Sequence, residues 1–145
     1  MTIRALTASG ILLTAFAACK PHAENGGSNE NYSVPQPGSV VTKAVTETND
    51  QLNHFTFSVF VKAGGQSNRG IYEVLAVYGH DTATGQFTMP RGGEHLRPLL
   101  RKGDEPSTFI VGFHYGGDTA FYDYYKVSGT HGAISMQYMK GYSFK

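Results

Sequence analysis

The sequence has 145 residues, enough for one domain, and 40% of them are hydrophobic while 16% are charged. This composition argues against a disordered chain and against a coiled coil. The formal net charge of +1 provides no strong field for holding nucleic acid or an anionic membrane surface. The single cysteine, Cys19, excludes an intramolecular disulfide and any zinc site built from cysteines.

Residues 1–18 have the features of a secretory signal. Arg4 is the only charge before Lys20, and the stretch between them is apolar or small. This run is shorter than the about 20 apolar residues that a membrane-spanning helix needs. It ends in small residues, as a signal peptide does before its cleavage point. We therefore expect residues 1–18 to be removed from the mature protein.

The end of this segment, Phe16-Ala17-Ala18-Cys19, resembles the lipobox of bacterial lipoproteins. In that family the chain is cut before the cysteine, so the resemblance implies lipidation of Cys19. Phe16 stands where the family usually has Leu. Acyl chains contribute about 0.8 kcal/mol per buried methylene and would anchor the protein in a membrane. Lys20 follows the cysteine in place of Asp, which in the family points to the outer membrane. An ordinary signal peptide with an incidental cysteine is the alternative.

Residues 20–38 read KPHAENGGSNENYSVPQPG and contain almost no apolar side chain. Such a segment cannot bury enough surface to offset the entropy of ordering it. We expect residues 19–38 to form a lipidated tether with a reach of about 25 Å, and residues 39–145 to form the folded domain.

From residue 39 the pattern changes to that of β-strands. The clearest alternation lies in residues 53–62, where Phe55, Phe57, Val59 and Val61 fall on one face. Residues 70–78 are apolar on both faces and predict a central strand, whereas residues 39–48 predict an edge strand. Turn signals occupy residues 79–85 and 116–118. In chain order, the expected strands are residues 39–48, 53–62, 70–78, 86–89, 107–115, 119–127 and 133–139.

Seven strands separated by turn signals, without a convincing helical period, predict an all-β fold. An antiparallel β-sandwich is the architecture that we expect. Within it, residues 81–90 (DTATGQFTMP) resemble a segment of the transthyretin-like, carboxypeptidase-regulatory-like β-sandwiches. The resemblance implies a turn at Thr84-Gly85 and a core position for Phe87. One branch of that family hydrolyses a urate-derived ring and ends in Tyr-Arg-Gly-Ser. This chain ends differently, so we do not extend the resemblance to that activity.

Histidines and serines show no arrangement typical of a metal centre or a hydrolase. The six histidines include no pair at ligand spacing, and His80 and His114 are the pair most able to meet in space. No G-x-S-x-G motif is present, and Ser107, Ser128 and Ser135 have no evident partner base. We therefore expect no catalytic residue, no metal and no cofactor.

Carboxylates come close together in the sequence at two places. Asp104-Glu105 lies in a charged loop, where a solvated turn is the simplest interpretation. Asp118 and Asp123 flank the start and middle of a strand. Glycoside cleavage needs two carboxyl groups about 5–9.5 Å apart across a cleft, a spacing that the sequence alone does not establish.

Aromatic residues are concentrated in residues 121–125. Strand alternation places Tyr122 and Tyr124 on one face, with Phe121 and Tyr125 opposite. Tyrosine buries an apolar ring while keeping its hydroxyl in water, so it suits a binding surface. The alternative is that these rings are divided between the core and a cross-strand ladder.

The section from Pro90 to Asp104 is the second candidate site. It contains Arg91, Arg97, Arg101 and Lys102 and is longer than most connections in a sandwich. Long loops on a rigid β scaffold often carry function, and these four positive charges would suit an acidic partner. The alternative is an irregular loop or a short edge strand.

Together these features predict a lipid-anchored, non-catalytic protein of the bacterial cell envelope that docks or scaffolds another envelope protein. We expect no nucleic-acid partner. The order of anchor, tether and small sandwich resembles that of transthyretin-like lipoproteins in type VI secretion systems, which implies a part in a secretion machine. Three other interpretations remain open: a module that binds a glycan or small ligand through Tyr122 and Tyr124, an immunity or inhibitor lipoprotein, and a hydrolase whose site assembles from loops.

Overall fold

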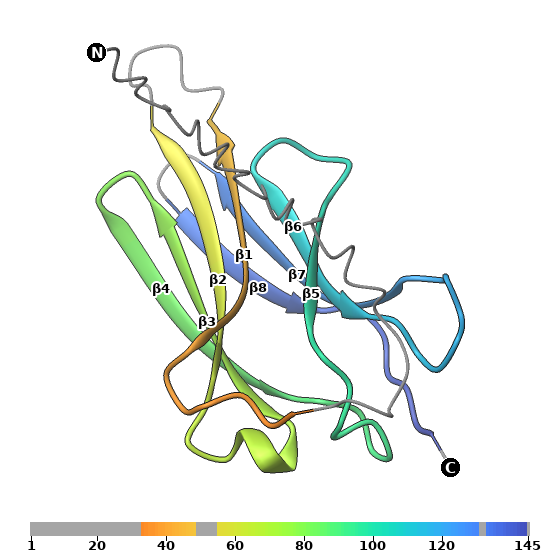
Figure 1. Ribbon diagram of the computed structural model, residues 1–145. Coiled ribbons are helices and arrows are strands. Elements are labelled where there is room, and N and C mark those ends of the chain that lie inside the picture. Colours follow the sequence, from red (N-terminus) through yellow and green to blue (C-terminus); the bar gives the residue numbers. More distant parts are fainter. Residues whose placement is uncertain (1–32, 49–54, 131–132, 145) are drawn as a thin grey trace, which may run out of the picture.

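The computed structural model describes residues 33–48, 55–130 and 133–144, so the predicted signal peptide, Cys19 and residues 20–32 lie outside the described residues. Within these ranges the chain forms one short 3-10 helix and eight strands (Figure 1). The strands are β1 (Val40–Glu47), β2 (Thr56–Ala63), β3 (Ile71–Tyr78), β4 (Asp81–Thr88), β5 (Leu99–Lys102), β6 (Thr108–Phe113), β7 (Tyr122–Thr130) and β8 (Ala133–Tyr138). The helix, η2, spans Ser67–Arg69. Across these same ranges, no helix has the length and apolar character that crossing a membrane requires.

Two antiparallel four-stranded sheets make up the fold, in the orders β1-β2-β3-β4 and β5-β6-β7-β8. The sheets stack face to face, with β1 beside β5 and β4 beside β8 (Figure 1). The predicted all-β architecture, a sandwich of two antiparallel sheets, is therefore confirmed, with eight strands instead of the expected seven. β1 is an edge strand and β3 a central one, as the sequence predicted.

The core lies between the sheets and follows the predicted alternation of β2. Phe57, Val59 and Val61 are fully buried. Across the sandwich, the Phe57 ring stacks on Phe109 of β6 with 5.8 Å between ring centroids. Burying such apolar surface is the main favourable contribution to folding. Phe55 differs, because it lies just before the start of β2, is half-buried and contacts the His80 ring.

The region from residue 79 to residue 104 differs most from expectation. The turn is confined to Gly79 and His80, and the predicted turn at Thr84-Gly85 is wrong because both residues pair with β3 inside β4. Phe87 does enter the core, as the family resemblance implied. The irregular section contains the extra strand, β5, which was the short edge strand considered as an alternative.

The connection from β6 to β7 is longer than the predicted tight turn at residues 116–118, and β7 starts three residues later than expected, at Tyr122. The Asp118 amide donates to the Tyr115 carbonyl, and the Asp118 carboxylate accepts from the Ala120 amide at 2.9 Å. A bulge then inserts Tyr124 as an extra residue, because Val111 pairs with Tyr125 while Gly112 pairs with Asp123. A bulge of this kind interrupts the alternation of faces along its strand.

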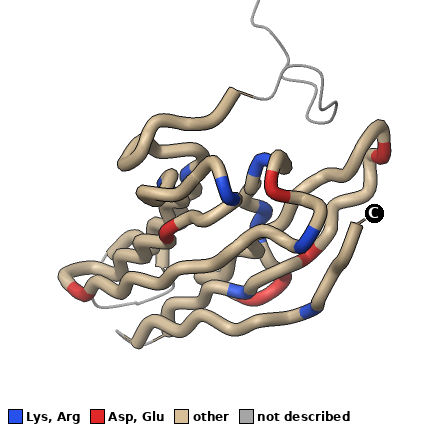
Figure 2. The backbone as a smooth tube through the Cα atoms, turned by 90° about the horizontal axis from the view of Figure 1, so that it is seen from below, with Lys and Arg blue, Asp and Glu red and all other residues tan. Residues whose placement is uncertain are grey.

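The chain enters the sandwich at one end, which we call the entry end. Residues 33–38, expected to belong to the tether, lie against the β2–β3 loop. The Ser67 hydroxyl donates to the Pro35 carbonyl at 2.9 Å, and the Gly38 amide donates to the Ala63 carbonyl at 2.7 Å. The β4–β5 loop and the C-terminal segment meet at the same end, since the Phe144 amide donates to the Arg91 carbonyl. Figure 2 views this end from below.

Candidate functional site

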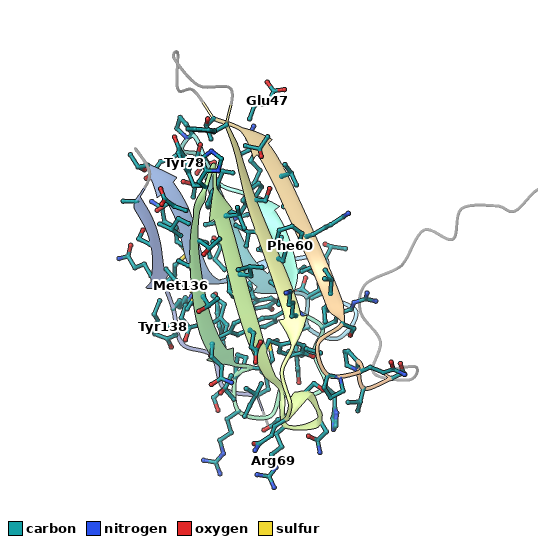
Figure 3. The ribbon with its side chains drawn as sticks, turned by 90° about the vertical axis from the view of Figure 1, so that its left-hand side faces the viewer. Glu47, Phe60, Arg69, Tyr78, Met136 and Tyr138 are labelled. Atoms are coloured by element: carbon teal, nitrogen blue, oxygen red, sulfur yellow. The ribbon has the colours of Figure 1, made fainter. Side chains whose placement is uncertain are left out.

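The β8 edge combines exposure with an apolar composition. β8 reads AISMQY, has no charged side chain, and pairs only with β7. Met136 and Tyr138 are 37% and 52% exposed, and the next residue, Met139, is 44% exposed. Figure 3 looks at the side where β4 and β8 approach each other and shows Met136 and Tyr138 at the margin of the sandwich. We call Met136, Tyr138 and Met139 the β8 strip.

Residues of β4 and β7 contact two side chains of the β8 strip. The Met136 side chain lies over Gly85 of β4, where an added Cβ would come within 2.5 Å of the Met136 Cε. The Tyr138 ring contacts Tyr125 and Tyr124 of β7, with centroids 5.3 and 5.7 Å away. Met136 and Tyr138 are therefore held against the domain while part of each side chain faces solvent.

The main chain of β8 also has an open side. Antiparallel strands direct the hydrogen-bonding groups of alternate residues to opposite sides. The Met139 amide donates to the Tyr124 carbonyl at 2.9 Å. The main-chain groups of Met139 and of every second residue before it therefore face β7. The groups of Ile134, Met136 and Tyr138 consequently point away from β7. They form a row of donors and acceptors that an additional strand can use.

The other three edge strands carry charges that discourage strand addition. β1 contains Lys43 and Glu47, β4 contains Asp81, and β5 ends in Arg101-Lys102. Proteins commonly protect exposed edges with such residues, because an unpaired edge is a template for another chain. Among the four edges that the structure describes, β8 alone lacks this protection, and this makes it the candidate docking site.

The predicted tyrosine pair is divided between the core and the surface. Tyr124 is buried, and its hydroxyl donates to the Thr88 carbonyl at 2.7 Å. Burial raises the pKa of Tyr124 to about 12. Tyr122 is half-buried and stacks on Phe113, while its hydroxyl donates to the Asp118 carboxylate, an interaction that raises the pKa of Tyr122.

Tyr122 and Tyr124 do share a face, as the alternation predicted, because both rings contact Phe113. The expected position of Tyr125 on the opposite face is wrong. Its ring lies 5.6 Å from that of Phe87 in the core, because the bulge brings two consecutive tyrosines to the inner side.

The four basic residues of the second candidate site do not gather into one patch. Arg101 bonds both carboxylate oxygens of Asp123, at 2.8 and 3.1 Å, and lies 4.8 Å above the Phe121 ring. Arg97 donates to the Val41 carbonyl at 3.3 Å. Arg91 is at the entry end, whereas Lys102 is exposed at the far end of β5. Figure 2 shows basic and acidic residues interspersed over the entry end.

An aromatic cluster at the entry end was not predicted from the sequence. Tyr115 and Phe144 stack nearly parallel with centroids 4.0 Å apart, and Tyr122 lies 5.4 Å from Tyr142. We call these four residues the entry-end cluster. Tyr142 and Phe144 follow the last strand without any strand pattern, so nothing in their own sequence pointed to this packing.

The remaining candidates stay apart or serve the fold. His80 lies in the β3–β4 turn, and His114 follows β6 and bonds the Ala120 carbonyl. Ser128 and Ser135 bond each other across β7 and β8 at 2.8 Å. Glu105 pairs with Lys126. Over residues 33–48, 55–130 and 133–144, no three His, Cys, Asp or Glu side chains come together in a way that could hold a metal ion.

Comparison with protein-family models, with curated proteins and with solved structures finds no match for this chain.

Proposed function

We propose that this protein is a lipid-anchored, non-catalytic module of the bacterial cell envelope that docks a partner chain through the β8 edge. The observation that carries the proposal is the open side of β8, which combines unpaired main-chain groups with the exposed β8 strip and no charge. A docking module needs an edge or a face of this kind, whereas a solitary domain gains nothing from leaving it uncovered.

Docking would occur by strand addition. A partner strand laid beside β8 would bond the outward groups of Ile134, Met136 and Tyr138, and its side chains would meet the β8 strip. Main-chain bonds supply affinity in this mode, while alternate side chains supply specificity. Methionine adapts its shape to a partner, and tyrosine offers a large ring with few rotatable bonds. Both properties suit a docking edge.

Acylation of Cys19 would place this edge near a membrane, preferentially the outer one. Because residues 33–38 lie on the domain, only residues 20–32 would separate the lipid from the entry end. A flexible chain of this length reaches about 20 Å. Confinement to within about 20 Å of the membrane raises the effective concentration of the module for a partner in the same membrane. In this proposal the module would itself belong to a secretion machine, as its resemblance to type VI lipoproteins implied.

Lipidation is tested first, with the full-length chain carrying a tag after Lys145. Cells producing the wild type or Cys19→Ala are fed a radiolabelled fatty acid, and the membrane fraction is separated. We expect label and membrane association for the wild type and neither label nor stable association for Cys19→Ala. A wild-type chain without label would refute the anchor.

Docking through β8 is tested by placing a photo-crosslinking amino acid at position 136. Position 45 on β1 is the matched control, because Val45 is also on an edge strand and is more exposed, at 57%. We expect a discrete protein adduct from position 136 and little from position 45. Equal yields from the two positions, or none from position 136, would contradict docking through this edge.

A ligand-binding module is the second candidate, and the entry-end cluster is the observation that favours it. Tyr115, Tyr122, Tyr142 and Phe144 are all only partly buried, and partly exposed rings can stack on a sugar or another flat ligand. A glycan array would compare the wild type with Tyr115→Ala, using Tyr138→Ala on β8 as the control. Binding that falls only in Tyr115→Ala would favour this candidate over protein docking.

A further inference from the structure

We infer that the occupant of the β8 edge is a second copy of this chain, so that two domains join through an antiparallel β8–β8 contact. This inference rests on the proposed function, because it names the partner of the same edge. A two-fold axis makes such a contact isologous, with each copy contributing the same surface.

The charge pattern of β8 is the first argument for a second copy. In an isologous antiparallel contact, the strand must face its own residues, so a charged strand risks placing like charges opposite each other, which is destabilising. β8 contains no charged residue and meets this condition over its whole length. β5, by contrast, ends in Arg101-Lys102, and a two-fold axis at either residue would place that residue opposite its own copy.

The pattern of side chains along β8 is the second argument. With the two-fold axis at Met136, the outward groups of Met136 bond those of Met136 in the second copy. Ile134 of one copy then lies opposite Tyr138 of the other, and Ser135 lies opposite Gln137. Apolar residues therefore meet apolar or aromatic ones, and polar residues meet polar ones. This register uses every outward main-chain group from Ile134 to Tyr138.

The resulting assembly has ordinary dimensions. Two four-stranded sheets become one eight-stranded sheet, which lies within the usual range for open sheets. The antiparallel contact turns the two entry ends in opposite directions. Both lipid anchors would therefore reach one membrane when the strands lie along its surface. A contact through a single short strand is small, so confinement at the membrane would strengthen it.

The identity of the photo-adduct from position 136 separates this inference from the proposed function. An adduct of twice the chain's mass, containing only this sequence, is the expected result. An adduct with a different protein would overturn the second copy while leaving docking through β8 in place. Absence of an adduct would overturn both.

A disulfide test is specific for the second copy. In this register the two Met136 residues form a hydrogen-bonded pair, whose Cα atoms lie about 5.5 Å apart, which is within the range that a disulfide bridges. Met136→Cys should therefore form a disulfide-linked dimer in envelope preparations, whereas Val45→Cys and the wild type, with Cys19 alone, should not. Equal dimer yields from Val45→Cys would overturn the inference.

Charge placed on the two-fold axis provides the converse test. Met136→Lys brings two ammonium groups together, so we expect the association constant of the dimer in detergent to fall about tenfold, a loss equivalent to about 1.4 kcal/mol. Val45→Lys is the matched control and should leave the dimer unchanged. If Met136→Lys does not fold, Met136→Pro removes only an outward N–H group and serves the same purpose. A dimer that persists in folded variants of both kinds would refute the β8–β8 contact.

Discussion

The Tyr124 hydroxyl donates a 2.7 Å hydrogen bond to the carbonyl oxygen of Thr88, the last residue of β4. This bond joins the two sheets, because Tyr124 belongs to β7 in one sheet and Thr88 to β4 in the other. The ring itself packs edge-on against Phe87 and Phe113. Tyr124, which the sequence analysis assigned to a candidate binding face, thus links the two sheets next to Tyr138 of the β8 strip.

Removing this bond should destabilise the domain measurably. Tyr124→Phe keeps the ring but leaves the Thr88 carbonyl without its partner, and we expect a loss of about 1–2 kcal/mol in the free energy of unfolding. Urea denaturation followed by circular dichroism measures this loss. Tyr138→Phe is the control, because Tyr138 is 52% exposed and its hydroxyl can reach water. Equal losses in the two variants would mean that the inter-sheet bond contributes nothing.

Stability should also fall at high pH in a way that depends on Tyr124. Burial raises the pKa of Tyr124 to about 12, from an ordinary value of about 10. Between these values the unfolded chain releases the phenolic proton while the folded chain keeps it, so the free energy of unfolding decreases as pH rises. The contribution is complete below pH 10 and is lost as pH approaches 12.

The urea midpoint measured from pH 9 to pH 11.5 tests this dependence. We expect a flat region up to about pH 10 and a decline above it, with a shallower decline in Tyr124→Phe. Some slope should remain in that variant, because burial also raises the pKa of Tyr125 and Tyr142. A decline of unchanged steepness in Tyr124→Phe would show that other groups account for it.

Strands with unbroken alternation were predictable from the sequence, and β4 shows why others were not. The inner face of β2 carries an uninterrupted series of large apolar residues, so it could be predicted directly from Phe57, Val59 and Val61. The inner face of β4 holds Ala83 and Gly85 before Phe87, and the small residues resemble a turn. Gly85 has no room for a side chain because Met136 from the opposite sheet occupies the space above it. The cause lies about fifty residues away along the chain, beyond the reach of local patterns.

The candidate site depends on features that no single strand reveals. Whether β8 is open depends on the order of the strands, since the same six residues would be covered in the middle of a sheet. Whether Tyr124 is exposed depends on one bulge beside Gly112, where an added Cβ would collide with Phe121. The sequence predicted the tyrosine-rich segment and the edge position of β1. It did not predict that β8 would be an open edge.

Two glycines should respond oppositely to the same substitution. A Cβ at Gly129 would lie 2.7 Å from ring carbons of both Phe57 and Tyr78. Because these rings are buried, Gly129→Ala overpacks the core, and we expect a loss of about 1–3 kcal/mol. At Gly117 no atom lies within 4 Å of an added Cβ. Gly117→Ala should leave stability unchanged or increase it by up to about 1 kcal/mol.

Thermal unfolding of the two glycine variants side by side provides the measurement. The chemical change is identical, so the difference between the variants reports on packing alone. If Gly129→Ala unfolds at the wild-type temperature, the Phe57 and Tyr78 rings have room to move apart, and the close packing of β7 against β2 and β3 is not required.

Arg101 should act within the domain instead of at a docking surface. Its guanidinium bonds Asp123 through two contacts and lies over Phe121, although the two side chains are 53% and 36% exposed. Exposed pairs contribute little, so we expect Arg101→Ala to lower the free energy of unfolding by no more than about 1 kcal/mol. The loss should shrink in high salt, because ions screen an exposed pair.

Arg101→Lys and Lys102→Ala complete this test. Lysine keeps the charge of Arg101 but loses the planar contact of the guanidinium with Phe121, so the stability of Arg101→Lys should lie between those of the wild type and Arg101→Ala. Lys102→Ala removes a neighbouring exposed charge and should have no effect on stability. If docking occurs at β8, which is the opposite edge of the same sheet, all three variants should give the wild-type yield of photo-adduct from position 136. An adduct lost only in Arg101→Ala would instead place Arg101 in the partner interface, because the expected loss of stability is too small to unfold the domain.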